Sequence, residues 1–207
     1  MRLGISVWDL QPQNLAWVLM RQSAHFERLP MLGEEISILT YPAGFDRVFT
    51  FRDYQVFDAQ QRCIIQAAST WLLMDTQARK MTRIPDFITA LSPAIPAPEK
   101  CLPRCGFTLY PLETFDRTQL SKVGWYDLDF NAHVNNVQYV KWMLETIPTD
   151  TLKDKHLQTL EIQFRAECRL GDEVQSASHA IESTMYKHQL TLNGSQKELA
   201  LAKTTWT

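Results

Sequence analysis

The segment from Val123 to Pro148, VGWYDLDFNAHVNNVQYVKWMLETIP, constrains the fold of this chain more than any other part of its sequence. It starts with a short apolar run at 123–126, which predicts a strand, and continues through a polar turn. Apolar residues then recur at helical spacing from Asn135 to Thr146, with asparagine as the N-cap and proline shortly after the run. Polar residues form only a narrow stripe on this helix, and such a helix is usually buried. We therefore expect the rest of the chain to cover it.

Three polar side chains lie where this predicted strand ends and the helix begins. Asp129, Asn131 and His133 alternate with other residues along the turn. A carboxylate, an amide and an imidazole beside the unpaired N–H groups of a helix start can hold a developing oxyanion. Turns rich in Asp and Asn also serve purely as capping devices, so the residues alone leave both interpretations open.

Most of the remaining sequence favours strands. Residues 1–13 are expected to form a loop, and the run 14–29 a strand in its second half. The other predicted strands are 36–40, 48–56, 63–74, 107–110, 157–168, 173–182, 185–192 and 199–206. Proline recurs through residues 82–111, which rules out a continuous helix or a central strand there. We therefore predict a first unit at 1–84, a proline-rich linker at 85–111 and a second unit at 112–207.

The two predicted units repeat each other weakly. Phe26 and the Leu-Gly-Glu-Glu run at 32–35 correspond to Phe164 and the Leu-Gly-Asp-Glu run at 170–173. The repeat indicates an α+β fold with repeated antiparallel sheets. The long helix of the second unit has only a partial counterpart in the first, because a shift back by 138 residues places its equivalent at −3 to 8 and that of the preceding strand wholly upstream of Met1. The first unit is thus expected to lack its opening strand and most of its helix.

Three motifs carry a resemblance to a known family. They are DLDFNAHVNNVQYVKWMLETIP, LEIQFRAEC at 160–168, and GFDRVFTFRDYQVFD at 44–58 followed by AASTW at 67–71. Taken in their order along the chain, they resemble the acyl–acyl carrier protein thioesterases of plants and bacteria. The resemblance implies a tandem (double) hotdog, in which each antiparallel sheet wraps around a central helix. It also implies a thioester hydrolase that releases free fatty acid and ends fatty acid synthesis.

The resemblance implies a set of catalytic residues, which are Asp129, Asn131, His133, Glu167 and Cys168. His133 and Asn131 would polarise the thioester carbonyl, and Asp129 would orient them. Glu167 is expected to act as general base on water, because a carboxylate at a strand end can be partly desolvated. Cys168 as a nucleophile stays an alternative. Strand alternation places Glu167 and Cys168 on opposite faces, so only one is expected to face His133.

The acyl chain and its carrier set further expectations. Trp17, Phe26, Phe51 and Trp71 are candidates to line an apolar tunnel, by resemblance and composition. Acyl carrier protein is the expected partner, met by a basic surface near the site. No cofactor is expected. Cys101 and Cys105 lack a second ligand pair beside them, and zinc takes about four ligands, so no metal is expected.

Overall composition excludes several other classes. The formal net charge of −2 does not suggest a nucleic-acid binder. No apolar run approaches the roughly 20 residues that span a bilayer, and four cysteines suit a reducing cytoplasm.

Exposed sheet in an incomplete first unit would associate, so a homo-oligomer is expected. Two alternatives stay open: an acyl-coenzyme A thioesterase of the hotdog fold, and a non-catalytic acyl-binding hotdog module.

Overall fold

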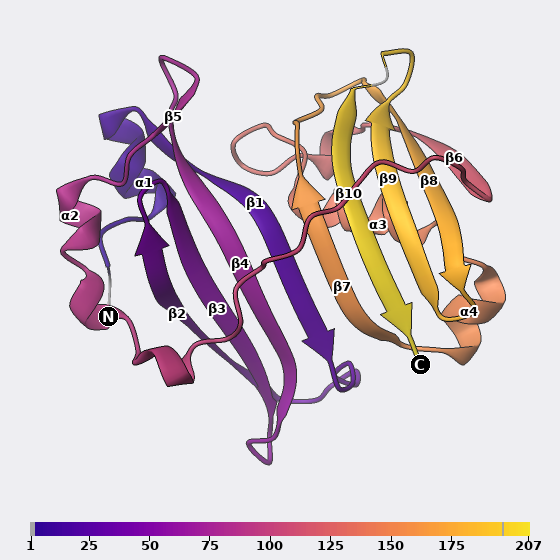
Figure 1. Cartoon of the computed structure of the whole chain (residues 1–207), viewed down its shortest axis with the longest axis horizontal. Coiled ribbons are helices and arrows are strands. Elements are labelled where there is room, and N and C mark those ends of the chain that lie inside the picture. The colour runs from indigo at the N-terminus through magenta and orange to yellow at the C-terminus, as the bar shows by residue number, and fades with distance from the viewer. Residues whose placement is uncertain (1–2, 196) are drawn as a thin grey trace. The chain divides into compact units, whose positions relative to one another are not determined.

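The chain forms two compact units, seen in a computed structural model that describes residues 3–195 and 197–207 (Figure 1). The first unit is Met1–Gly106 and the second is Phe107–Thr207. The boundary lies inside the proline-rich segment 85–111.

The first unit is built on an antiparallel sheet. Its strand order is β2-β3-β4-β1, and the short β5 pairs with β4. The strands are β1 (Leu15–Phe26), β2 (Ile36–Asp46), β3 (Phe49–Asp58), β4 (Cys63–Asp75) and β5 (Lys80–Thr82). The described helices of this unit have only three or four residues; they are α1 (Val7–Leu10), α2 (Asp86–Thr89) and 3-10 turns at Gln11–Gln13, Ser92–Ala94 and Pro98–Lys100.

One end of this sheet is covered by two short helices, α1 before the strands in sequence and α2 after them. Leu10 from α1 and Ile88 from α2 are fully buried against Leu73 of β4. Trp17 packs against this cluster and donates its indole N–H to the carbonyl of Ile5 at 2.9 Å. The segment expected as a loop therefore contains a helical turn, because Leu10 gains burial there. Residues 1–2 of that expectation lie outside the described residues.

The other face of the sheet is crossed by the end of the proline-rich segment. The Cys105 thiol donates to the carbonyl of Ala68 at 3.2 Å, and the Leu102 amide donates to Asp53 Oδ2 at 2.7 Å. The Arg104 guanidinium lies 4.3 Å above the centre of the Phe51 ring. These contacts fix residues 102–105 onto β3 and β4. Burial raises the pKa of Asp53, whose carboxyl group lies beneath this segment.

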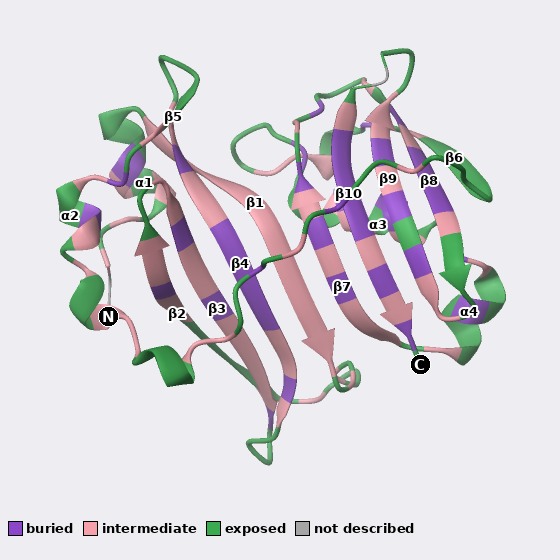
Figure 2. Cartoon of the chain, in the orientation of Figure 1, coloured by how far each residue is buried: buried purple, intermediate pink, exposed green. Residues whose placement is uncertain are grey.

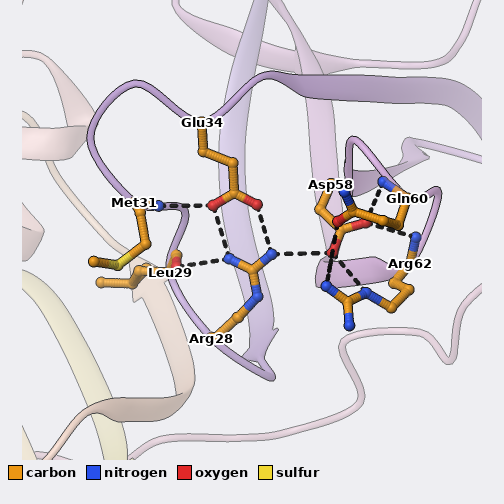
Figure 3. Close-up of polar contacts among 7 residues, drawn as sticks. All are labelled: Arg28, Leu29, Met31, Glu34, Asp58, Gln60 and Arg62. Carbon is orange, nitrogen blue, oxygen red and sulfur yellow. Dashed lines mark hydrogen bonds and ion pairs between the residues drawn. The ribbon is translucent and has the colours of Figure 1, made fainter.

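A polar network holds the turn after β1 to the turn after β3 (Figure 3). Arg28 binds Glu34 through two hydrogen bonds of 2.9 and 2.6 Å and reaches Asp58 at 3.0 Å. The hydrogen bond from Arg28 lowers the pKa of Glu34 to about 2. Burial acts to raise the pKa of Asp58, but hydrogen bonds from Arg62 and Arg28 lower it to about 2. The carboxylates thus stay ionised, and the network joins the loop between β1 and β2 to the turn between β3 and β4.

The second unit packs a helix on an antiparallel sheet. Its strand order is β7-β10-β9-β8-β6. The strands are β6 (Arg117–Lys122), β7 (Leu157–Phe164), β8 (Glu173–Glu182), β9 (Met185–Leu192) and β10 (Glu198–Trp206), and the helices are α3 (Asn136–Leu144), α4 (Thr149–Asp154) and a 3-10 turn at Trp125–Asp127. α3 contacts β8 and β9, and buried positions recur along β8, β9 and β10 (Figures 1 and 2). Tyr139, Trp142 and Met143 form the buried side of α3.

The structure confirms the central helix and most strands, and it corrects several predictions. Residues 123–126 are not a strand; the Asp127 carboxylate accepts the Gly124 amide at 2.8 Å and closes a turn there. The strand of this region is β6, just upstream. Residues 107–110 are also not a strand. The predicted strand 157–168 ends at Phe164, because the next two amides both donate to the Leu199 carbonyl.

Two further boundaries differ from the predictions. β1 spans all of Leu15–Phe26, where a strand was expected only in the second half of 14–29. The central helix ends at Leu144, and Pro148 is the N-cap of the separate helix α4. Among the described residues, no helix is long and apolar enough to cross a membrane.

Candidate active site

The turn before α3 is held together by one carboxylate. Asp129 Oδ1 accepts the backbone N–H of Asn131 at 2.8 Å and that of His133 at 3.2 Å. The Asp129 amide donates to the His133 carbonyl at 2.7 Å, and Leu128 pairs with Val134 as an isolated bridge. Asp129 therefore orients both expected oxyanion-binding residues through their main chains, and does so as the local cap of the turn.

The turn leads directly into α3. Asn135 is the N-cap, and its side-chain oxygen accepts the Val137 amide at 3.0 Å. Ala132 has a φ of 60°, a left-handed conformation that non-glycine residues adopt at a cost of about 1 kcal/mol or more. The surrounding hydrogen bonds impose this conformation. Asn131 and His133 consequently stand exposed beside the start of a helix, where N–H groups favour negative charge.

Glu167 lies three residues after the end of β7, and its side chain approaches this turn. His133 Nδ1 and Glu167 Oε1 are 3.7 Å apart, an ion-pair distance rather than a hydrogen bond. Their side chains are 56% and 54% exposed, so Glu167 is less desolvated than the sequence led us to expect. A carboxylate that faces Nδ1 can orient the ring, and the imidazolium form, which carries a proton on both nitrogens, can then donate from Nε2 to a substrate oxygen. The two residues that the sequence led us to expect as base and oxyanion donor thus lie close together.

Cys168 lies in a different environment from its neighbour. It is 2% exposed, and its thiol donates to the hydroxyl of Tyr139 at 3.4 Å. Burial raises the pKa of the Cys168 thiol, which disfavours the thiolate. The residues 165–168 are not a strand, yet Glu167 is exposed and Cys168 is buried. Glu167, not Cys168, is the residue paired with His133.

The four expected tunnel residues do not share one surface. Trp17, Phe26 and Trp71 occupy the same face of the first unit's sheet, because their positions follow the β1–β4 register. Phe51 pairs with Thr70 and lies on the opposite face, beneath Arg104. Phe51, which was selected by resemblance and composition, therefore does not share the sheet face of the other three. The other three are half-buried, and the Trp71 indole donates to Ser69 Oγ at 2.8 Å.

Sequence reasoning missed two features beside this site. The Tyr139 hydroxyl contacts the segment around Glu167, although its helical spacing looked like ordinary core. An apolar groove of about 350 Å³ also runs along the outer side of α3 and α4, lined by Val137, Val140, Lys141, Leu144, Glu145 and Leu152. Its sequence signal was the spacing of three apolar residues on α3, of which Val137 is exposed and Val140 and Leu144 are half-buried. Among the described residues, no cluster of His, Cys, Asp and Glu side chains can hold a metal ion.

Each of the two units matches one domain of the same protein family. Residues 1–91 match the acyl-ACP thioesterase N-terminal domain, and residues 112–207 match the acyl-ACP thioesterase C-terminal domain. The chloroplastic acyl–acyl-carrier-protein hydrolase FATB3 of Cuphea viscosissima is 27% identical, over 96% of this chain and 50% of its own length. The chloroplastic oleoyl-acyl carrier protein thioesterase of Coriandrum sativum is 32% identical over 79% of this chain and 47% of its own.

A solved structure agrees with these matches. The 12:0-ACP thioesterase from Umbellularia californica superposes with a TM-score of 0.82 at 24% identity, covering 96% of this chain and 78% of that one. At this identity the likeness establishes the fold, a double hotdog that is mostly β with few helices. The chain spans about half the length of the curated relatives it matches. The N-terminal and C-terminal domains of one family occur here in that order, and the chain belongs to the acyl-ACP thioesterase family.

Proposed function

We propose that this chain hydrolyses the thioester bond of fatty acyl–acyl carrier protein and releases a free fatty acid. The observation that carries the proposal is the 3.7 Å approach of His133 Nδ1 and Glu167 Oε1 at the start of α3. That pair occurs in a chain of the acyl-ACP thioesterase family, and relatives are named as hydrolases of acyl carrier protein thioesters. Acyl carrier protein is therefore the proposed carrier.

The proposed reaction begins with water held by the Glu167 carboxylate. Glu167 takes a proton from this water as its oxygen forms a bond to the thioester carbon. The carbonyl oxygen becomes an oxyanion, which His133, Asn131 and the start of α3 stabilise. The carbon–sulfur bond then breaks, and the proton on Glu167 passes to the departing thiolate. The products are a fatty acid and the carrier thiol, and Glu167 is restored.

Asp129 and the aromatic residues of the first unit have supporting roles in this proposal. Asp129 holds the backbone of Asn131 and His133, so both donors are in place before the substrate binds. Trp17, Phe26 and Trp71, which share one sheet face, are the proposed apolar surface for the acyl chain. Phe51 has no part in that surface.

The test is a panel of acyl carriers of graded chain length, with free thiol as the readout. We expect turnover of acyl carrier protein substrates that falls about 10²- to 10³-fold in His133→Ala and in Asn131→Ala, and strongly in Glu167→Gln. Preferential turnover of acyl-coenzyme A would change the proposed carrier but keep the chemistry. Acyl binding without turnover, or full activity in all three variants, would contradict the proposal.

A further inference from the structure

The hydroxyl of Tyr139 contacts the backbone on both sides of Glu167. Tyr139 Oη donates to the Ala166 carbonyl at 3.3 Å and accepts the Cys168 amide at 3.2 Å. It also accepts the Cys168 thiol at 3.4 Å. One donor and two acceptor sites are all that a phenol offers, so this hydroxyl is fully used by the segment that carries Glu167.

That segment needs such support because it has left the sheet. β7 ends at Phe164, and backbone groups beyond it must find partners outside the strand ladder. The amides of Arg165 and Ala166 donate to the Leu199 carbonyl, and Lys197 Nζ donates to the Glu167 carbonyl at 3.4 Å. The Ala166 carbonyl and the Cys168 amide are bound by Tyr139.

The His133–Glu167 pair does not fix its own geometry. Both side chains are about half exposed, and exposed ion pairs contribute little to holding two side chains together. Their separation must therefore follow from the two backbones. His133 lies on the turn that ends at the Asn135 N-cap, and Tyr139 lies one helical turn further along α3. One helix thus anchors both members of the pair.

We propose that Tyr139 is a positioning residue, which holds Glu167 toward His133 through the Ala166 carbonyl and the Cys168 amide. This inference rests on the proposed function, in which Glu167 is the base. The ring of Tyr139 is itself fixed, with its centre 5.9 Å from that of Trp142 and 5.7 Å from that of Phe164. Burial raises the pKa of Tyr139, so its hydroxyl remains a neutral donor.

The experiment compares Tyr139→Phe with Tyr186→Phe in the full chain. Phenylalanine keeps the ring packing and removes only the hydroxyl. Tyr186 is the matched control: it is also buried, and its hydroxyl contacts Thr151 Oγ1 at 3.1 Å, with no bond to residues 166–168. We expect Tyr139→Phe to lower kcat about tenfold or more with KM changed less than about twofold, since misplacement of a reacting group by about 1 Å can cost 10²-fold. Tyr186→Phe is expected to keep wild-type kcat.

A double-mutant cycle with Glu167→Gln separates positioning from a general structural effect. If Tyr139 acts through Glu167, its substitution will change the residual rate of Glu167→Gln less than about twofold. An equal loss in both backgrounds, or wild-type kcat in Tyr139→Phe, would overturn the inference. Full activity in Glu167→Gln alone would instead overturn the proposed function, so the two failures are distinguishable.

A measurement on the unmodified protein covers the case in which Tyr139→Phe does not fold. The amide of Cys168 is buried and bound to Tyr139 Oη, so its hydrogen exchange should be strongly protected. The Glu167 side chain beside it is half exposed, so burial of the whole segment does not explain that protection. Exchange of the Cys168 amide at the rate of an open loop would show that the bond is absent and would overturn the inference.

Discussion

At the scale of single residues, Glu167 and Cys168 are adjacent in sequence and opposite in environment. Glu167 is half exposed and faces His133, whereas Cys168 is buried and bound to Tyr139. Alternation along the chain predicted that only one of them faces His133, and this holds although the segment is not a strand. The role of Tyr139 was not predictable, because a tyrosine at helical spacing is indistinguishable from core until its hydroxyl is located. Phe51 was grouped with the other three aromatic residues because neither resemblance nor composition carries strand register.

Substitution of Cys168 tests this contrast. We expect Cys168→Ala to keep kcat within about threefold of wild type and to lose about 1 kcal/mol of unfolding free energy, a typical loss for a small buried change. The reason is that burial raises the thiol pKa and the thiol points at Tyr139, not at the carbonyl site. Steady-state kinetics and thermal unfolding measure the two effects. A trapped acyl-cysteine at residue 168 would contradict this prediction.

At the scale of elements, α3 covers a sheet face that includes a buried polar pair. His188 of β9 is 1% exposed, and its Nε2 lies 2.9 Å from Thr204 Oγ1 of β10. β9 and β10 were predicted to within one residue at each end, although burial alternates along β9 only and residues 199–202 of β10 are all buried. β6 was missed because RTQLSK is polar and mostly exposed, so pairing with β8, not a hydrophobic pattern, makes it a strand. Residues 123–126 were mistaken for a strand because their apolar character masked the Asp127 turn.

The buried imidazole predicts acid sensitivity of the second unit. Burial lowers the pKa of His188 to about 4 from 6.5. As pH falls below about 6.5, the unfolded chain gains a proton that the folded chain does not take until about pH 4, so stability should decline across this window by about 3 kcal/mol. Denaturant unfolding at several pH values measures the decline. We expect His188→Gln to lack it and Thr204→Val, which keeps the buried imidazole, to retain it; the same decline in His188→Gln would contradict this.

At the scale of the whole molecule, the two units protect their outer strands differently. β6, the last strand in the second unit's order, carries Arg117 and Lys122 at its ends. β2, the last strand in the first unit's order, has no charged residue before Asp46 and exposes Ile36, Ile38 and Leu39. An uncharged apolar edge strand is a surface on which chains associate, and charged side chains are the usual protection. The repeat of two units predicted the sheets, but not which edge would be unprotected.

We therefore expect self-association through β2, measured as the concentration dependence of the sedimentation coefficient. Ile38 is 64% exposed, and its backbone pairs with Val56 of β3. Ile38→Lys should therefore place a charge on the exposed surface of β2 without removing a buried side chain. In a symmetric contact the substitution occurs twice, and each isoleucine contributes about 1.5–3 kcal/mol when fully buried, so association should weaken at least about tenfold. Gln119→Lys on β6 is the control, because that edge already carries two cations. Wild-type chain that stays monomeric at high concentration, or equal association in Ile38→Lys, would show that β2 is not the contact.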